Sequence, residues 1–231
     1  MTTSISILSY IGIAIAGITG RFVLFVAGAA ALAIPALAIA YVRKALAAHR
    51  EASRATAGDL QYRADAFHSP THTWLAPQAD GLAVGLDDFG QKLLPSVTAV
   101  DLPRIGARVR RGEPVAVLHA GRFSVRVPAP VDGTVQAINR GVERDPGRVK
   151  SDRGDAWLFR VAPGEPSYLR FPKGDETKAW LAAEQTRLAR FVEGELGLMA
   201  ADGGELPAPS QVPAQLGEEG FGRLMGAFLE A

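Results

Sequence analysis

From Phe67 onward, the sequence is divided into short runs that favour β-strands, each bounded by Gly, Pro or Asp. The runs are THTWLAP, GLAVGL, SVTAVDL, EPVAVLHA, FSVRVPAP, GTVQAI and WLFRVAP. Short strands at this spacing are typical of an all-β sandwich or barrel. The alternation of Val115 with Val117, and of Val125 with Val127, predicts one inward face on each of two strands.

The segment LDDFGQKLL interrupts this pattern between Leu86 and Leu94. Asp87 or Asp88 is predicted to cap a short helix there, with the apolar side chains facing inward. Large aromatic side chains dominate small cores, so Trp74 and Trp157 are predicted to fill the barrel interior.

Six motifs in a fixed order resemble one known family. They are Ser69-Pro70-Thr71-His72-Thr73-Trp74; Val84–Gln91; Leu102-Pro103 with Gly106, Val109 and Gly112-Glu113-Pro114; Pro130-Val131-Asp132-Gly133 with Val135 and Asn139; Asp145-Pro146; and Gly154–Leu158. Together they resemble the glycine cleavage system H protein, a lipoyl-domain family with a barrel-sandwich hybrid fold. The resemblance implies a mainly β barrel-sandwich hybrid (lipoyl-like) domain over residues 66–170.

The same resemblance implies a cofactor arm, and the chain departs from the family at that point. The family modifies a lysine in a turn that reads E-S-V-K-A. Alignment backwards from Pro130 without gaps puts His119, Ala120, Gly121, Arg122 and Phe123 on those five positions. Arginine keeps a positive charge but has no amine that forms the lipoyl amide. We therefore expect no lipoate and no other cofactor, with Arg122 as a candidate partner contact.

Other chemistry is largely excluded by residue content. The chain has no cysteine, so thiolate chemistry and cysteine-held metals are not expected. Its net charge is +1, so attraction of nucleic acid by overall charge is not expected either. No nucleophile elbow, phosphate loop or dinucleotide fingerprint occurs. Pro70 separates His68 from His72, which argues against a metal pair and favours a structural His72. We predict no enzyme activity, no catalytic residue and no metal site.

The N-terminal region contains an apolar run of membrane-spanning length. Phe22–Val42 is 21 residues without a charge, and a bilayer requires about 20 such residues as a helix. Gly28 and Ala36 lie on its small-residue surface, which predicts contact with another membrane helix. The uncharged stretch Ser4–Thr19, within residues 1–21, is predicted to lie in the membrane interface or to pack against a partner subunit, and a two-helix hairpin remains an alternative.

Flanking charge predicts the orientation of this span. Arg43, Lys44, Arg50 and Arg54 follow it, whereas Arg21 alone precedes it. Basic excess marks the cytoplasmic side, so the C-terminal domain is expected at the cytoplasmic face of the inner membrane. Residues 43–65 are expected to be a stalk or linker, with Ala45–Ala57 continuing the helix to Gly58.

Arginines gather in one turn of the predicted barrel, at positions 104, 108, 110 and 111. Two interpretations remain open. They are either a solvated face or a surface that contacts anionic headgroups or an acidic partner.

Two amphipathic helices are predicted after the barrel, within residues 171–200 and 201–231. Asp175–Met199 has apolar residues at helical spacing. Asp202–Gln215 is expected to be an extended linker. Phe221, Met225 and Phe228 then form a short apolar face, which docks either on a partner or on the chain's own domain.

Together these features predict a non-enzymatic, membrane-anchored accessory subunit of a larger bioenergetic complex, respiratory or photosynthetic. Its partners would be other subunits of that complex and the lipid bilayer. Two alternatives remain: a membrane-tethered carrier of the H-protein type, and a periplasmic adaptor of an efflux system. The host complex, its cofactors and the copy number do not follow from the sequence.

Overall fold

A computed structural model describes residues 33–44, 54–150, 156–196 and 209–230, and it divides into two compact units, Met1–Ala52 and Ser53–Ala231. In the first unit, residues 33–44 are helical and their side chains are exposed. No helix among the described residues is both long and apolar enough to cross a bilayer. The predicted span Phe22–Val42 includes residues 22–32, which are outside the described residues, as is all of Ser4–Thr19. The membrane placement of both segments stays a prediction.

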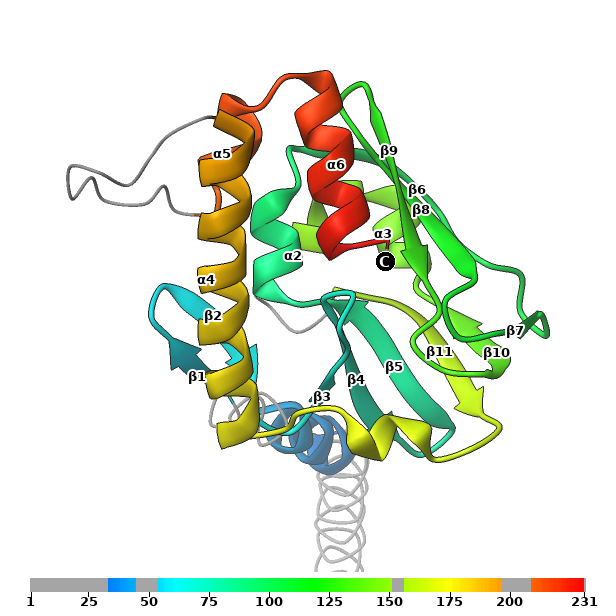
Figure 1. Ribbon diagram of the computed structural model, residues 1–231. Helices are drawn as coiled ribbons and strands as arrows, with labels where there is room; N and C mark the ends of the chain where they lie inside the picture. The colour runs from blue at the N-terminus through cyan, green and yellow to red at the C-terminus, as the bar shows by residue number, and fades with distance from the viewer. Residues whose placement is uncertain (1–32, 45–53, 151–155, 197–208, 231) are drawn as a thin grey trace, which may run out of the picture. The chain divides into compact units, whose positions relative to one another are not determined.

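The second unit is built on three sheets whose strands all pair antiparallel (Figure 1). Their orders are β1-β2, β3-β4-β5-β11-β10-β7 and β6-β8-β9. The bounds are β1 Arg54–Ala57, β2 Leu60–Arg63, β3 Phe67–His68, β4 Thr73–Gln78, β5 Gly81–Leu86, β6 Val97–Asp101, β7 Arg108–Val109, β8 Pro114–Ala120, β9 Phe123–Pro128, β10 Gly133–Ile138 and β11 Trp157–Pro163. The predicted mainly β domain is thereby confirmed.

Short helices connect the strands, and longer ones follow them. They are α2 Asp88–Leu93, α3 Arg140–Arg144, the 3-10 helices η1 Pro146–Lys150 and η2 Ser167–Arg170, α4 Asp175–Leu196, α5 Val212–Gln215 and α6 Glu218–Phe228. The predicted helix at Leu86–Leu94 is confirmed as α2, and the two C-terminal helices as α4 and α6. The prediction of an extended linker to Gln215 is wrong at its end, because Val212 is buried and begins α5.

The strands β8 and β9 form a hairpin whose inward face differs partly from the prediction. Val125 and Val127 are buried as predicted, and they lie opposite Leu118 and Ala116. Directly paired residues of antiparallel strands share a face. The buried set on β8 is therefore Ala116, Leu118 and Ala120. The prediction that Val117 faces inward is wrong, whereas the half-buried Val115, at a register shift in the pairing, packs against the main core.

The two tryptophans also pack elsewhere than predicted. Trp74 and the half-buried Trp157 belong to a small separate cluster that includes Ala66, Ala76 and Ala83. Side chains alternate between the faces of a strand, so Leu75 enters the main core while its neighbour Trp74 does not. Phe89 and Phe159 are the largest barrel side chains with no exposed surface in the main core.

The predicted helical stalk is wrong where the structure describes it. Arg54–Ala57 is strand β1, which pairs with β2 around a turn where Gly58 has a φ of 61°. Leu60 and Tyr62 of this hairpin are buried in the main core. Burial of these two side chains accounts for the strand pairing, which local helix propensity does not reveal.

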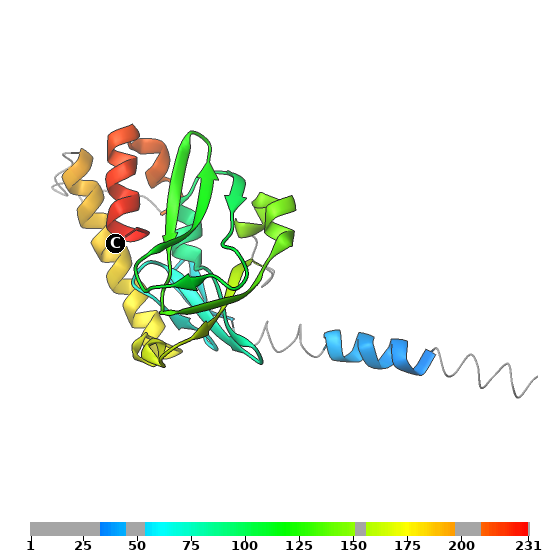
Figure 2. The same cartoon turned by 90° about the vertical axis from the view of Figure 1, so that its right-hand side faces the viewer.

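The C-terminal helices complete the core of the barrel. Leu181, Leu188 and Val192 of α4 share one buried cluster with the apolar side chains of α6 and of the sheets. Figures 1 and 2 show α6 between α4 and the β8–β9 hairpin. The H-protein-like region and the tail therefore form one folded unit, rather than a barrel with a detached extension.

The register of β8 gives a direct test. Leu118 is fully buried, so Leu118→Ala is expected to lower the free energy of unfolding by about 2–5 kcal/mol. Val117 is only half-buried, and Val117→Ala is expected to cost about 1 kcal/mol or less. Urea denaturation of both variants measures the difference, and a larger loss for Val117→Ala would contradict the register.

Candidate functional site

The tip of the β8–β9 hairpin is the first candidate site. Gly121 and Arg122 form a two-residue turn between Ala120 and Phe123, which pair with each other. Gly121 has a φ of 64°, a left-handed conformation that glycine adopts without steric cost. Arg122 is the outermost long side chain of this turn and is 66% exposed.

Helix α6 lies against this tip and fixes the surroundings of Arg122. The Arg122 guanidinium is 3.6 Å from Glu218 at the start of α6 and lies 5.2 Å from the centre of the Phe123 ring. The Phe123 ring packs on Phe221 with a centroid separation of 4.1 Å. Strand β9 is an edge strand, and the backbone N–H of Arg126 donates a 2.8 Å hydrogen bond to Glu230. The hairpin is therefore covered on its α6 side.

The predicted partner contacts on α6 are used inside the chain. Phe221, Met225 and Phe228 are 1–3% exposed and belong to the main core. Of the two docking alternatives, packing on the chain's own domain is the one the structure shows. These three side chains are unavailable to a partner in this arrangement. Of the other predicted contacts, Ala36 lies on the exposed helix 33–44, and Gly28 is outside the described residues.

None of the chain's five lysines lies on the hairpin turn. They are Lys44, Lys92, Lys150, Lys173 and Lys178, and all belong to described segments. Lys92 is paired with Asp88 at 2.9 Å, and the amine of Lys150 donates a hydrogen bond to the carbonyl of Leu94. Partial burial lowers the pKa of Lys150. Arg122 is thus the cationic side chain at the tip.

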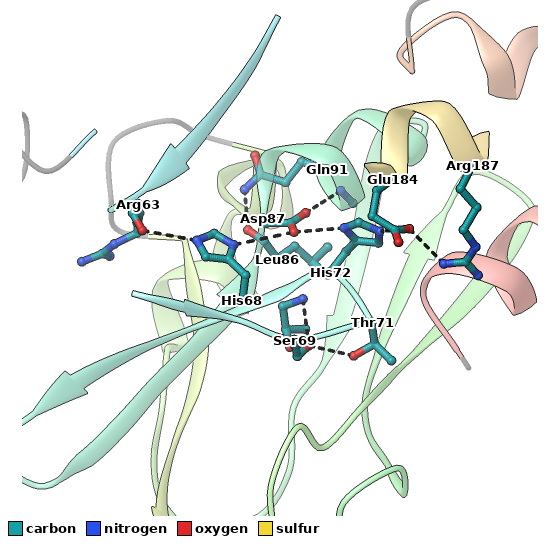
Figure 3. A network of polar contacts seen from close by, with 12 residues as sticks. Arg63, His68, Ser69, Thr71, His72, Leu86, Asp87, Gln91, Glu184 and Arg187 are labelled. Atoms are coloured by element: carbon teal, nitrogen blue, oxygen red, sulfur yellow. Dashed lines mark hydrogen bonds and ion pairs between the residues drawn. The ribbon is translucent and has the colours of Figure 1, made fainter. Parts of the chain in front are cut away.

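A buried polar network joins the barrel to α4 and is the second candidate site (Figure 3). His72 has no exposed side-chain surface, and its Nδ1 lies 3.0 Å from the Asp87 carboxylate. Its Nε2 faces Glu184 of α4 at 3.5 Å, a distance that is within ion-pair range but too long for a good hydrogen bond. Glu184 in turn accepts a 2.9 Å hydrogen bond from Arg187.

Asp87 holds this network in place from the start of α2. It is the N-cap residue, and its second carboxylate oxygen accepts a 2.8 Å hydrogen bond from the Gly90 N–H. The prediction of an Asp87 cap is confirmed. Asp87 is also 3.8 Å from the Nδ1 of His68, whose Nε2 lies 3.3 Å from the carbonyl of Arg63. One carboxylate therefore caps a helix and contacts the His72 imidazole, with the His68 ring nearby but beyond hydrogen-bond distance.

The loop that carries His72 is held in an uncommon conformation. His72 has a φ of 54°, in the left-handed region where histidine is found more often than most side chains. Its backbone is fixed on both sides, because its N–H donates to Ser69 and its carbonyl accepts from the Asp87 N–H. The ring stacks on Phe89 at 4.1 Å and lies 5.0 Å from Trp180. Packing thus directs both ring nitrogens at carboxylates.

The electrostatics of this arrangement favour a protonated His72. Burial alone lowers the pKa of His72, but the charges of Asp87 and Glu184 outweigh it and the pKa is raised. Burial likewise raises the pKa of Asp87, yet the His72 charge holds that pKa well below its usual value. The pKa of Glu184 is also lowered, against burial, by His72 and Arg187. The imidazolium then links the barrel to α4.

Sequence reasoning identified part of this network. It predicted a structural, hydrogen-bonded His72 and an Asp87 cap, and both are found. It missed Glu184, which lies 112 positions after His72 in the sequence. The sequence signal for this contact was the position of Glu184 among the apolar residues of α4. Within the described segments, no group of three or more His, Asp or Glu side chains is arranged to hold a metal ion.

His119 lies near the hairpin tip, on the outer face of the three-stranded sheet. Its Nε2 is 2.9 Å from Asp101, and its Nδ1 is 3.1 Å from the hydroxyl of Ser124. The side chains of His119 and Asp101 are 36% and 70% exposed, and Ser124 is exposed as well. No enclosed cavity or further charged group converges on them among the described residues. We assign them no chemical role.

Known proteins resemble this chain over the barrel region. The family model described as "Glycine cleavage H-protein" matches residues 66–184, which is 119 of 231 residues. The chain is 37% identical over 100 residues to the glycine cleavage system H protein of Thermus thermophilus, covering 43% of this chain and 78% of that protein. It is 33% identical over 119 residues to that of Ralstonia nicotianae, covering 51% and 87%.

Among solved structures, one similar chain is a glycine cleavage system H protein from Mycobacterium marinum. The identity is 24% and the TM-score is 0.45, over 53% of this chain and 99% of that one.

The His72 network predicts a pH dependence of stability. The folded-state pKa of His72 is raised, so its stabilising effect is complete below the unfolded value of about 6.5 and is lost as pH rises through the raised pKa. Asp87 and Glu184 have lowered pKa values, so their effect is present above about pH 4 and is lost on acidification. Urea denaturation between about pH 2 and 9 measures both limbs of this profile.

His72→Asn tests the assignment, because asparagine also tolerates a positive φ. We expect a loss of about 3–5 kcal/mol near pH 6, since the buried Asp87 is left without its cation and Glu184 keeps only Arg187. The fall in stability above pH 6.5 should also weaken. His119→Asn is the matched control at an exposed imidazole, and an equal change in its pH profile would contradict the role of His72.

The packing of α6 on the hairpin gives a third test. Phe221→Ala is expected to lower the free energy of unfolding by about 3–5 kcal/mol, because it removes a buried ring. Glu218→Gln removes only an exposed ion pair and is expected to cost about 1 kcal/mol or less. Thermal and urea denaturation compare them, and equal losses would argue against a hairpin held mainly by the aromatic contact.

Proposed function

The chain belongs to the glycine cleavage H-protein family, and on that premise we propose that it is a non-enzymatic member whose barrel works without a lipoyl arm. In this proposal the barrel serves as a fixed protein–protein surface in a membrane-associated complex. The observation that carries the proposal is Arg122 at the tip of the β8–β9 hairpin.

The lipoyl group does not fit the residues at that tip. Lipoate is joined to its domain through an amide with a lysine amine, and a guanidinium does not form this bond. The five lysines of the chain lie elsewhere, and both Lys92 and Lys150 are already engaged by other groups. The relatives are named as H proteins of the glycine cleavage system, and carrier chemistry of that kind is not assigned to this chain.

The surroundings of the tip support a fixed surface rather than a mobile arm. A swinging arm requires a turn whose side chain is free to leave the domain. Here the turn lies beside Glu218, its neighbour Phe123 is packed on Phe221, and β9 is joined to Glu230. Packing of α6 on the hairpin restricts the movement of the turn. The exposed Arg122 side chain is then suited to contact an acidic surface on a partner.

The proposed placement is the inner membrane, with one span over Phe22–Val42 and the barrel on the cytoplasmic side. A two-span arrangement that includes Ser4–Thr19 is the alternative. Support comes from the exposed apolar side chains of residues 33–44, such as Leu37 and Tyr41, which are 69% and 74% exposed. Arg43 and Lys44 follow them. The partners would be other subunits of a respiratory or photosynthetic complex.

Intact-mass spectrometry tests the loss of the arm. We expect the purified protein, produced in a host that lipoylates its own H protein, to have the mass of the unmodified chain. The Arg122→Lys variant restores an amine at the tip and is expected to gain a lipoyl group. A lipoyl adduct on the wild-type chain would overturn the proposal in favour of a tethered carrier.

Purification from native membranes tests the accessory role. In mild detergent we expect the chain to migrate with other membrane subunits in a defined stoichiometry, and recovery as a free monomer would contradict it. Protease treatment of right-side-out vesicles tests the orientation. The barrel should be protected, and its digestion from outside would refute the cytoplasmic placement.

A further inference from the structure

Two exposed aliphatic side chains stand out on the second unit, and basic residues flank both. Apart from helix 33–44, Ile105 and Leu169 are the large apolar side chains that remain more than half exposed in the described residues, at 58% and 59%. Ile105 lies in the loop between β6 and β7, next to Gly106, which has a φ of 84°. Leu169 lies in η2, directly before Arg170.

The arginines around Ile105 and Leu169 have few ion-pair partners within the described part of the chain. Arg104, Arg108 and Arg110 are exposed, and their guanidinium groups contact no carboxylate in the described parts of the structure. Two acids that contact this turn accept backbone hydrogen bonds: Glu113 from the Arg110 N–H and Asp132 from the Arg111 N–H. The guanidinium groups are therefore available to an external anion.

The two loops belong to one end of the molecule. Arg111 lies over the ring of Phe171 at 5.4 Å, which joins the turn after β7 to the segment after η2. The Gly164 N–H also donates a 2.9 Å hydrogen bond to the carbonyl of Asp132. Figure 1 shows the loop before β7 and the chain leaving β11 at the same end of the six-stranded sheet. We name residues 104–111 and 169–173 together the basic loop face.

We propose that the basic loop face binds the anionic headgroups of a membrane surface, with Ile105 and Leu169 entering the interface between headgroups and acyl chains. This is a contact separate from the proposed N-terminal span, and it adds to the membrane placement proposed above. Basic side chains near an anionic leaflet are attracted over about one Debye length. Aliphatic side chains flanked by such cations then gain by leaving water.

The shape of the face favours lipid over an acidic protein. Protein docking sites are built around a buried anchor pocket, whereas these two aliphatic side chains are exposed on separate segments, the β6–β7 loop and η2. The arginines are spread along the loops rather than paired around one point, which suits a surface of many equivalent charges. Phe171, the aromatic ring next to Arg111, is only 7% exposed and offers no stacking platform for nucleic-acid bases.

A single-cysteine label tests this contact in the full-length protein. The chain contains no cysteine, so Ile105→Cys carries an environment-sensitive fluorophore at one defined site. Ala183→Cys on the exposed face of α4 is the control site, away from β7 in Figure 1. Each labelled protein is reconstituted into vesicles of phosphatidylcholine alone, and into vesicles that also contain phosphatidylglycerol.

We expect a blue shift of the label at position 105 in the phosphatidylglycerol vesicles, with no shift in phosphatidylcholine and none at position 183. The shift should be lost in 1 M salt, where the Debye length is about 3 Å, and in an Arg108→Glu/Arg110→Glu variant. That variant should keep the folded-state circular dichroism, because both side chains are exposed.

Two results would overturn the proposal. One is equal emission at position 105 in both vesicle types, and the other is a shift that appears only when a soluble acidic protein is added. The proposed N-terminal span is tested separately by vesicle flotation. If that proposal is wrong, the protein will not float with phosphatidylcholine vesicles. The two proposals therefore fail by different measurements.

Discussion

The contact of His72 with Asp87 and Glu184 connects the parts of this fold that the chain order keeps apart. Asp87 caps α2, His72 stacks on Phe89 in the barrel core, and Glu184 belongs to α4. Arg187 continues the chain of contacts, because it pairs with Glu184, donates to the Ala227 carbonyl of α6 and lies over the Phe228 ring. A charge buried in this way requires its partners, so the positions of α4 and α6 are coupled to the loop at His72.

This coupling determines what surrounds the β8–β9 hairpin. Once α4 is fixed, α6 is placed against β9, and its Phe221 ring covers Phe123. The β8–β9 hairpin thereby shares one core with the other strands, α4 and α6. Arg122 in the turn and the helix that covers the hairpin both support the proposal of a fixed surface.

Several features were predictable because they depend on near neighbours in the sequence. The Asp87 cap follows from a carboxylate three residues before a free backbone N–H, and the β8–β9 turn follows from Gly121 between two strand-forming runs. The errors have a common cause. Val117 and Leu118 are both apolar and favour a strand, and only pairing with β9 decides which of the two is buried. Arg54–Ala57 has helix-favouring alanines, but pairing with β2 makes it a strand.

The sequence by itself determined the mainly β domain, the family resemblance and the arginine at the turn, because strand periodicity, turn residues and ordered motifs are local properties. Only the tertiary structure decided that the tail docks on its own barrel, that Glu184 faces His72, and that the Arg111 guanidinium lies over the Phe171 ring. Each of these depends on residues that are tens of positions apart. Their proximity is set by which apolar faces the chain buries together, and sequence spacing alone does not specify that choice.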